Sequence, residues 1–301
     1  MPDIDVTPYL CDGSQPFEIA QSITSLDEPL YKDSDDYKSQ LGDLREEIDD
    51  LQCLMYAHNR HSMLLVFQAM DAAGKDGTIA SVMSGVNPHG FKVHAFKRPS
   101  EEELDHSYLW RTDHHAPARG CVSIFNRSYY EEVLVVRVHP EIVTKYQRIP
   151  AERIGSLDEF WEKRYRHIRE REVEGYDNGT TTVKFFLNVS KDEQARRFLS
   201  RIERKQKNWK FEAGDMKERA LWDEYQVAYE DAINATATPN APWYCVPADD
   251  KKSMRLIVAQ AIRNEMDKLH LEWPTLSEKE TAELGEYKKQ LLEELGESER
   301  A

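Results

Sequence analysis

The stretch FQAMDAAGKDGTIASVM, residues 67–83, joins an apolar run to a helical pattern through a turn that contains Gly74 and Lys75. A strand, a glycine-containing turn and a helix can cradle phosphate, because N–H groups at the helix start face the anion and a lysine reaches its outer oxygens. The full pattern has a glycine six residues before the lysine and a hydroxyl residue after it, whereas this chain has Ala69 and Asp76. The match is partial, and an ordinary strand-to-helix turn with a surface lysine is the alternative.

Five short runs rich in β-branched or aromatic residues predict strands, and most of them precede a helical pattern. They are SMLLVFQAM (62–70), FKVHAF (91–96), CVSIFN (121–126), TTVKFFLNV (181–189) and WYCVPA (243–248). This alternation favours the α/β class, with a parallel five-stranded sheet between two helical layers. Ligands of such sheets bind at the carboxyl ends of the strands. We therefore expect a site in the loops that begin near residues 70, 126 and 188.

The remaining segments differ in character. Residues 1–32 look irregular, and an amphipathic helix is predicted over residues 33–58. Residues 190–236 predict a helical insertion between the fourth and fifth strands, a hairpin interrupted at Gly214. The tail at 275–301 predicts a charged helix with a stripe of Leu and Tyr, which packs against its own domain or a second subunit.

The overall charge narrows the class of partner. With 40 Lys and Arg against 55 Asp and Glu, the formal net charge of −15 disfavours general binding to nucleic acid or anionic membranes. The four cysteines are far apart in sequence and predict neither a zinc site nor a disulfide framework. No signal-peptide pattern and no membrane-spanning apolar run are present in the sequence. We expect a cytoplasmic protein that binds neither membrane nor nucleic acid.

Three polar residues flank the phosphate loop. Asp71 is unfavourable beside a phosphate unless a cation intervenes, so it predicts a Mg²⁺ site. The strand at 121–126 ends in Asn126 and is followed by Arg127, which can neutralise a transferring phosphoryl group. A salt bridge at a helix start is the alternative role of Arg127. Because an ordinary nucleoside triphosphatase has a metal-binding aspartate at the end of this strand, Asn126 shifts the metal role to Asp71.

Two basic segments interrupt the acidic chain, HGFKVHAFKR (89–98) and RRFLSRIERKQKNWK (196–210). A long polyanion needs cations along a path and not in one pocket. Both segments are candidates for such a path, and solvated helix surface is the alternative for the second.

Three strings together resemble the polyphosphate kinase 2 family, kinases that move phosphoryl groups between inorganic polyphosphate and nucleotides. They are AMDAAGKDGTI (69–79), KRPSEEELDHSYLWR (97–111) and RGCVSIFNRSYYEEVLVVRVHPE (119–141). The resemblance covers residues 33–274, the predicted catalytic domain of a P-loop-kinase-like fold, with its lid at about 190–236. The NRSYY version at 126–130 resembles the subgroup that accepts nucleoside mono- and diphosphates, class III. Ala69 departs from the family, which more often has glycine there.

The resemblance implies a Mg²⁺-dependent homo-oligomeric enzyme that transfers the terminal phosphoryl group of polyphosphate directly to AMP and ADP, giving ADP and ATP. GMP and GDP are further candidate acceptors. Asp71, Lys75, Asn126 and Arg127 are expected to act at the transferring group. The expected phosphate-binding residues are Ala72, Ala73, Gly74, Lys75, Asp76, Gly77, Thr78, Lys92, Lys97 and Arg98. The expected lid residues are Arg197, which matches the family's arginine motif, and Arg201.

Two rival functions remain open on the sequence. An ATP-dependent nucleoside monophosphate kinase could use the same scaffold, although the missing hydroxyl after Lys75 and the basic lid disfavour it. A non-catalytic polyphosphate-binding protein is the other rival, and Asp71 disfavours it because binding alone gains nothing from that carboxylate.

Overall fold

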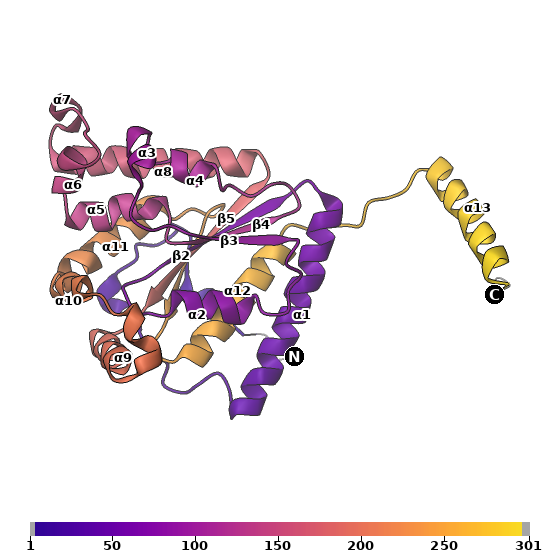
Figure 1. Ribbon diagram of the computed structural model, residues 1–301, viewed down its shortest axis with the longest axis horizontal. Coiled ribbons are helices and arrows are strands. Elements are labelled where there is room, and N and C mark those ends of the chain that lie inside the picture. The colour runs from indigo at the N-terminus through magenta and orange to yellow at the C-terminus, as the bar shows by residue number, and fades with distance from the viewer. Residues whose placement is uncertain (1–3, 297–301) are drawn as a thin grey trace. The chain divides into compact units, whose positions relative to one another are not determined.

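A six-stranded sheet forms the centre of the protein, in the order β1-β6-β5-β2-β4-β3. The computed structural model describes residues 4–296 of the chain (Figure 1). The strands are β1 (Leu10–Cys11), β2 (Ser62–Gln68), β3 (Phe91–Ala95), β4 (Val122–Asn126), β5 (Thr180–Asn188) and β6 (Trp243–Pro247). Strands β2 to β6 are parallel, which confirms the five predicted strands. The additional strand, β1, pairs antiparallel with β6 and is too short to leave a pattern in the sequence.

Helices cover both faces of the sheet and confirm the three-layer sandwich (Figure 1). One layer contains α1 (Ser34–His58), α2 (Lys75–Val82) and α12 (Lys251–Asp267). The other contains η3 (Tyr129–Val133), α5 (Val135–Val138), α8 (Leu157–Asp177) and α11 (Trp222–Thr236). Shorter elements in the connections are η1 (Thr7–Tyr9), η2 (Ile19–Gln21), α3 (Glu101–Asp105), α4 (Trp110–Asp113), α6 (Glu141–Lys145) and α7 (Ala151–Ile154).

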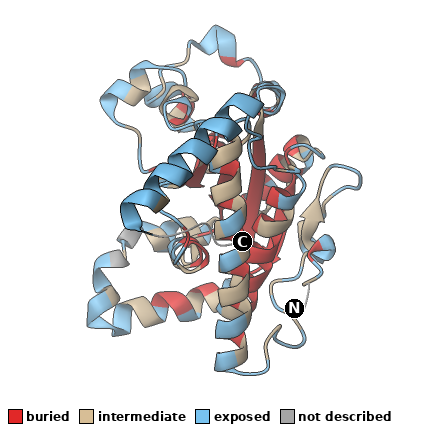
Figure 2. Cartoon of the chain, turned by 90° about the vertical axis from the view of Figure 1, so that its right-hand side faces the viewer, coloured by how far each residue is buried: buried red, intermediate tan, exposed pale blue. Residues whose placement is uncertain are grey.

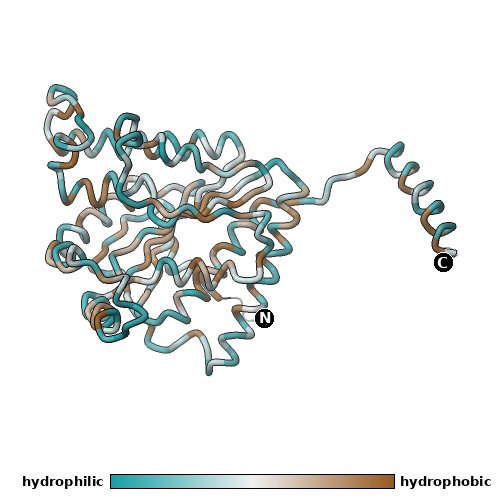
Figure 3. The backbone as a smooth tube through the Cα atoms, in the orientation of Figure 1, coloured by the Kyte–Doolittle hydropathy of each residue, from teal (hydrophilic) through white to brown (hydrophobic). Residues whose placement is uncertain are grey.

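The core lies along the central strands. Every residue of β2 is buried, and so is all of β5 after its first residue (Figure 2). The same strands are predominantly apolar, whereas the outer helices carry polar residues (Figure 3). Among the described residues, Lys184 is a fully buried charge: its ammonium lies 2.6 Å from Oε2 of Glu172, whose other oxygen, Oε1, accepts from the hydroxyls of Tyr129 and Tyr130. A buried charge of this kind needs its partners, because an unpaired one is strongly destabilising.

Local signals in the sequence explain the first helix. Asp33 caps α1 by accepting from the backbone N–H groups of Asp35 and Asp36, and Asn59 ends it in the left-handed conformation. The predicted apolar positions form the buried face of α1, with Leu41 and Ile48 among them. Helix α1 packs against α12 in the same helical layer.

The insertion is divided differently from the prediction. It contains α9 (Lys191–Glu203), η4 (Lys205–Lys210), α10 (Ala213–Ala220) and α11. The predicted interruption at Gly214 is wrong, because this glycine lies inside α10; the α-helical conformation instead ends after Glu203 and resumes at Ala213, with the 3-10 helix η4 between them. Helix α11 belongs to the core, since Tyr225 and Tyr229 on it are buried.

The N-terminal segment contains only short elements, and the C-terminal unit contains one described helix. Residues 4–32 carry η1, β1 and η2, and residues 1–3 of the predicted extension lie outside the described range. From Glu272 the chain forms a separate unit that contains α13 (Glu278–Leu295), on which Leu284, Tyr287 and Leu291 are exposed. Residues 297–301 of the predicted tail lie outside the described range. None of the described helices carries an apolar stretch long enough to cross a membrane.

Candidate active site

The turn after β2 places the start of a helix at the carboxyl edge of the sheet. Gly74 caps α2 with φ +114°, a conformation that residues with side chains rarely adopt. Ala72 is also left-handed, with φ +63°. The chain therefore reverses sharply into α2, whose first backbone N–H groups have no partner within the helix and suit an anion.

Lys75, the first residue of α2, reaches back over this turn. Its ammonium donates to the carbonyl of Ala69 at 2.7 Å. Burial lowers the pKa of Lys75 to about 8, the nearby Arg127 adds to the effect, and the carboxylates of Asp71 and Glu131 oppose it. Lys75 is half-buried, and its ammonium is held by the backbone of the turn.

Arg127 joins the loop after β4 to the phosphate loop. Its guanidinium donates to Asp71 at 2.9 Å and to Glu131 at 3.2 Å. Its backbone N–H donates to the carbonyl of Phe67, and its φ of +63° turns the chain out of the strand. Glu131 raises the pKa of Arg127 most, with a further contribution from Asp71, so the guanidinium stays charged. The structure thus brings Asp71, Lys75 and Arg127 together, and Arg127 forms the expected alternative salt bridge as well.

The acid after the lysine has a partner. The side-chain amide of Asn126 donates to the Asp76 carboxylate at 2.7 Å, which ties the end of β4 to the first turn of α2. Asp76 therefore links two of the loops that form the site.

Glu131 is the site residue that sequence reasoning missed. Its carboxylate is the second ion-pair partner of Arg127 beside Asp71. Burial raises the pKa of Tyr229, and the charge of Glu131 adds to the effect. The available signal was its position four residues after Arg127, the spacing at which side chains of a helical turn meet.

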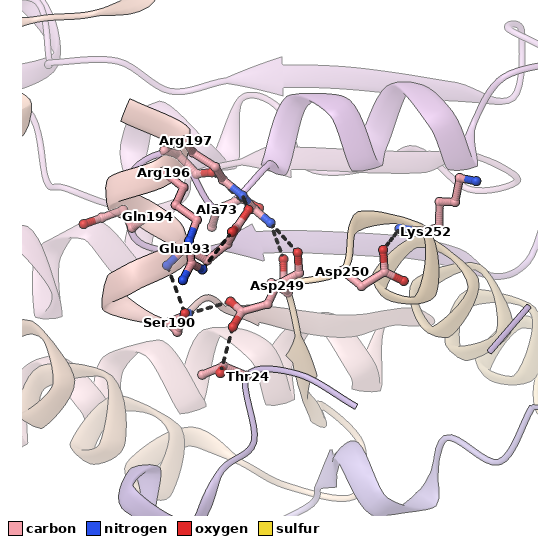
Figure 4. Close-up of polar contacts among 12 residues, drawn as sticks. Thr24, Ala73, Ser190, Glu193, Gln194, Arg196, Arg197, Asp249, Asp250 and Lys252 are labelled. Atoms are coloured by element: carbon pink, nitrogen blue, oxygen red, sulfur yellow. Dashed lines mark hydrogen bonds and ion pairs between the residues drawn. The ribbon is translucent and has the colours of Figure 1, made fainter. Parts of the chain in front are cut away.

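Arg197 on α9 is buried, with 7 % of its surface exposed. Its guanidinium carries five N–H donors. They are directed at the side chain of Glu193 (2.9 Å) and at the carbonyls of Ala72 (3.2 Å), Ala73, Ala248 (2.6 Å) and Asp249 (3.0 Å). Figure 4 shows Arg197 with Glu193, Ala73 and Asp249. In this arrangement Arg197 fixes the phosphate loop against the end of β6 and has no N–H left for a phosphate.

Asp249 connects the same region to the N-terminal segment (Figure 4). Its carboxylate accepts from the backbone N–H of Ser190 at 2.7 Å and from the Thr24 hydroxyl at 3.1 Å. The start of the insertion, the end of β6 and the N-terminal segment therefore meet beside the phosphate loop.

The remaining predicted residues are distributed more widely. Thr78 is buried, and both its N–H and its hydroxyl bond to the Gly74 carbonyl, so it belongs to the packing of α2. Arg201 on α9 pairs with Asp215 at 3.3 Å. Lys97 and Arg98 follow β3 at the carboxyl edge, whereas Lys92 lies three residues before the end of that strand, about 10 Å away along it. Lys92 is therefore not brought to the loop.

Ala69 needs no glycine. It is not among the residues with positive φ, and its methyl group is buried. We expect Ala69→Gly to change kcat/KM less than about threefold while lowering the free energy of unfolding by about 1 kcal/mol, through the lost methyl contact and the more flexible unfolded chain. Denaturant unfolding and steady-state rates measure the two effects. A large gain in activity would instead mean that the methyl group obstructs the loop.

The donors present fit a Mg²⁺ ion that is shared with substrate. Among the described residues no group of three or more His, Cys, Asp or Glu side chains could enclose a metal. Mg²⁺ commonly binds one or two carboxylates and completes its shell with substrate phosphates and water. Asp71 at the phosphate loop, with 28 % of its side chain exposed, supplies such a carboxylate.

A parallel sheet with a lysine-bearing phosphate loop after its central strand, and an arginine facing that loop, defines a P-loop-kinase-like protein. The family model for polyphosphate kinase 2 (PPK2) matches residues 31–273, and the chain belongs to this family. The chain is similar to the ADP-polyphosphate phosphotransferase of Rhodopseudomonas palustris, 50% identical over 265 residues that cover 88% of this chain and 91% of the relative.

Two further comparisons agree. The AMP/ADP-polyphosphate phosphotransferase of Meiothermus ruber is 46% identical over 239 residues, covering 78% of this chain and 84% of the relative. The crystal structure of polyphosphate kinase 2 from Arthrobacter aurescens TC1 matches with a TM-score of 0.81 and 35% identity, covering 94% of this chain and 98% of that one. The resemblance inferred from the motifs is confirmed.

Proposed function

We propose that this protein transfers the terminal phosphoryl group of inorganic polyphosphate to ADP and to AMP. The observation that carries the proposal is the convergence of Lys75, Arg127 and Asp71 on one phosphate loop. The names of the relatives from R. palustris and M. ruber support the donor, and between them they include both acceptors. The NRSYY sequence at 126–130 supports the wider acceptor range.

Transfer is direct and in line, without a covalent enzyme intermediate. An oxygen of the nucleotide's terminal phosphate is the nucleophile, and because that phosphate is already ionised the reaction needs little base catalysis. Lys75 and Arg127 hold their positive charges where negative charge spreads over the transferring oxygens, which stabilises the transition state. Asn126 positions the acceptor phosphate from its place beside Asp76.

Asp71 would hold Mg²⁺ together with phosphate oxygens. When bound, the ion neutralises phosphate charge and orients the transferring group. Arg127 contacts the same carboxylate at 2.9 Å, so the guanidinium and the metal site share one anchor.

The insertion lies at the edge of this site and acts as its lid. The Gln194 side chain on α9 donates to the Asp71 carbonyl at 2.9 Å, and Arg219 on α10 donates to Gln194 at 2.7 Å. These contacts join the insertion to the loop that carries the reaction. Closure over bound substrate excludes water, so the phosphoryl group reaches the nucleotide and is not hydrolysed.

Product analysis tests the function. The purified protein is incubated with Mg²⁺, polyphosphate and either AMP, ADP or GMP, and the products are resolved by phosphorus NMR. We expect ADP and ATP from the adenine acceptors. A parallel incubation with ATP and AMP in place of polyphosphate tests the rival kinase. If product forms only in the incubation with ATP, the donor is ATP and not polyphosphate. Binding of polyphosphate without product in any incubation would favour the non-catalytic rival.

The rate with limiting polyphosphate is expected to fall as pH rises through about 8. Lys75 is charged below its pKa of about 8 and loses its charge above it, while the phosphates of the substrates are already ionised there. The profile of kcat/KM reports this pKa in the free enzyme. In Lys75→Arg the guanidinium stays protonated, so we expect the decrease of kcat/KM above pH 8 to disappear, whatever the absolute rate. If the pH profile of that variant keeps the same midpoint, another group is responsible for the titration.

A further inference from the structure

Two cysteines that are distant in sequence lie side by side in the fold. The antiparallel pairing of β1 with β6 places the sulfur of Cys11 3.5 Å from that of Cys245. The two residues are separated by 234 positions in the chain. A disulfide bond has a sulfur–sulfur distance of about 2 Å, so a closure of roughly 1.5 Å would join them.

The two thiols differ in ways that suit successive roles. Cys11 is partly exposed at the edge strand, and the hydrogen bond with Cys245 lowers the pKa of the Cys11 thiol. Cys245 is buried, and burial raises the pKa of its thiol. A partly exposed thiol next to a second thiol is the arrangement that can react with peroxides and then be resolved as a disulfide.

We propose that Cys11 and Cys245 form a reversible oxidation site for hydroperoxides. The Cys11 thiolate attacks one peroxide oxygen, the O–O bond breaks, and the departing hydroxide takes up a proton to leave as water. The Cys245 sulfur then attacks the resulting sulfenic acid, the S–OH bond breaks, and the hydroxide leaves as water with the Cys245 proton. In total, two thiols are oxidised to one disulfide while one hydrogen peroxide molecule is reduced to two waters.

The disulfide would fasten the N-terminal segment to the sheet. Downstream of Cys11, Asn188 donates to the Ser22 carbonyl at 3.2 Å, and the Thr24 hydroxyl donates to Asp249 at 3.1 Å. These hydrogen bonds and the packing of apolar side chains such as Val6 and Leu10 against the core are non-covalent, so the disulfide would add a covalent link. Because it closes a loop that spans most of the chain, it restricts the unfolded state strongly and raises the melting temperature.

The test treats the full-length protein with hydrogen peroxide, removes the excess and compares it with untreated protein. We expect the intact mass to fall by two hydrogen atoms, a Cys11–Cys245 peptide pair to appear in a non-reducing digest, and the melting temperature to rise by about 5 °C or more. Dithiothreitol should reverse all three changes. Cys53→Ser is the matched control and should behave like the parent, whereas Cys11→Ser should lose the linked peptide and the shift.

Several outcomes would overturn the proposal. One is a Cys11 that accumulates sulfinic acid with no linked peptide. Another is a rise in melting temperature that persists in Cys11→Ser. Far-UV circular dichroism establishes that Cys11→Ser folds; if it does not, Cys245→Ala replaces it, and a linked peptide involving Cys11 in that variant would equally reject the pair.

Discussion

Replacing Lys75 with alanine is expected to lower kcat/KM for polyphosphate by about 10²–10³-fold, the usual effect of removing one charge-stabilising donor. The side chain starts at the first residue of α2 and folds back over the loop to the Ala69 carbonyl, so its ammonium lies over the turn that we propose as the phosphate cradle. Alanine leaves the turn intact because the left-handed residues are Ala72 and Gly74. Steady-state rates with ADP and varied polyphosphate measure the loss.

Lys38→Ala is the matched control for this substitution. Lys38 is an exposed lysine on α1 whose only described ion pair is with Asp35, a surface pair of little energetic weight. We expect its activity within about twofold of the parent, since such pairs contribute little. A Lys75→Ala protein that is folded by circular dichroism and nearly as active as Lys38→Ala would remove Lys75 from the mechanism.

The sheet could be predicted because its signal is local. Each parallel strand is a short apolar run that ends in a turn, and buried strands on both faces leave such runs in any sequence. Strand β1 was not predicted, because its two residues form a strand only by pairing with Tyr244 and Trp243, which lie far along the chain. The break in the insertion was misplaced at Gly214 because a single glycine is tolerated inside a helix.

The site could be predicted in part for a similar reason. The rule that ligands bind at the carboxyl ends of parallel strands was enough to bring Asp71, Lys75 and Arg127 together. The choice of partner for a long side chain is not local. Arg197 has the sequence position of a lid residue, yet its donors are used by carbonyls of the phosphate loop and of the end of β6.

The proximity of Cys11 and Cys245 could not be predicted from their spacing in the sequence. Wide spacing in the sequence predicted no disulfide framework, and the four cysteines are free in the structure. The 3.5 Å distance between the sulfurs of Cys11 and Cys245 follows from the antiparallel pairing of β1 with β6, which no local pattern indicates. Only the strand order, in which β1 lies next to β6, contains this information.

Replacing Arg127 with alanine is expected to lower kcat by about 10³-fold, at the lower end of the effect of arginines that stabilise a transferring phosphoryl group. In the structure the guanidinium lies between the carboxylates of Asp71 and Glu131, which keep it charged and fix its direction. Without it, these two carboxylates face the phosphate loop with less compensation. We therefore expect both a lower kcat and a changed KM. Single-turnover rates and steady-state rates together distinguish the two effects.

Arg127→Lys separates charge from shape. A lysine keeps the positive charge but cannot contact both Asp71 and Glu131 through a planar fork, so partial recovery is expected, with activity between the alanine variant and the parent. Arg166→Ala is the matched control, because Arg166 pairs only at the surface of α8, at 3.7 Å from Glu170. If Arg127 served only as a salt bridge, the alanine variant would lose stability in a denaturant titration while its kcat stayed near that of Arg166→Ala. If it acts on the transferring group, kcat falls in protein that is still fully folded, because the charge is needed most where negative charge accumulates in the transition state.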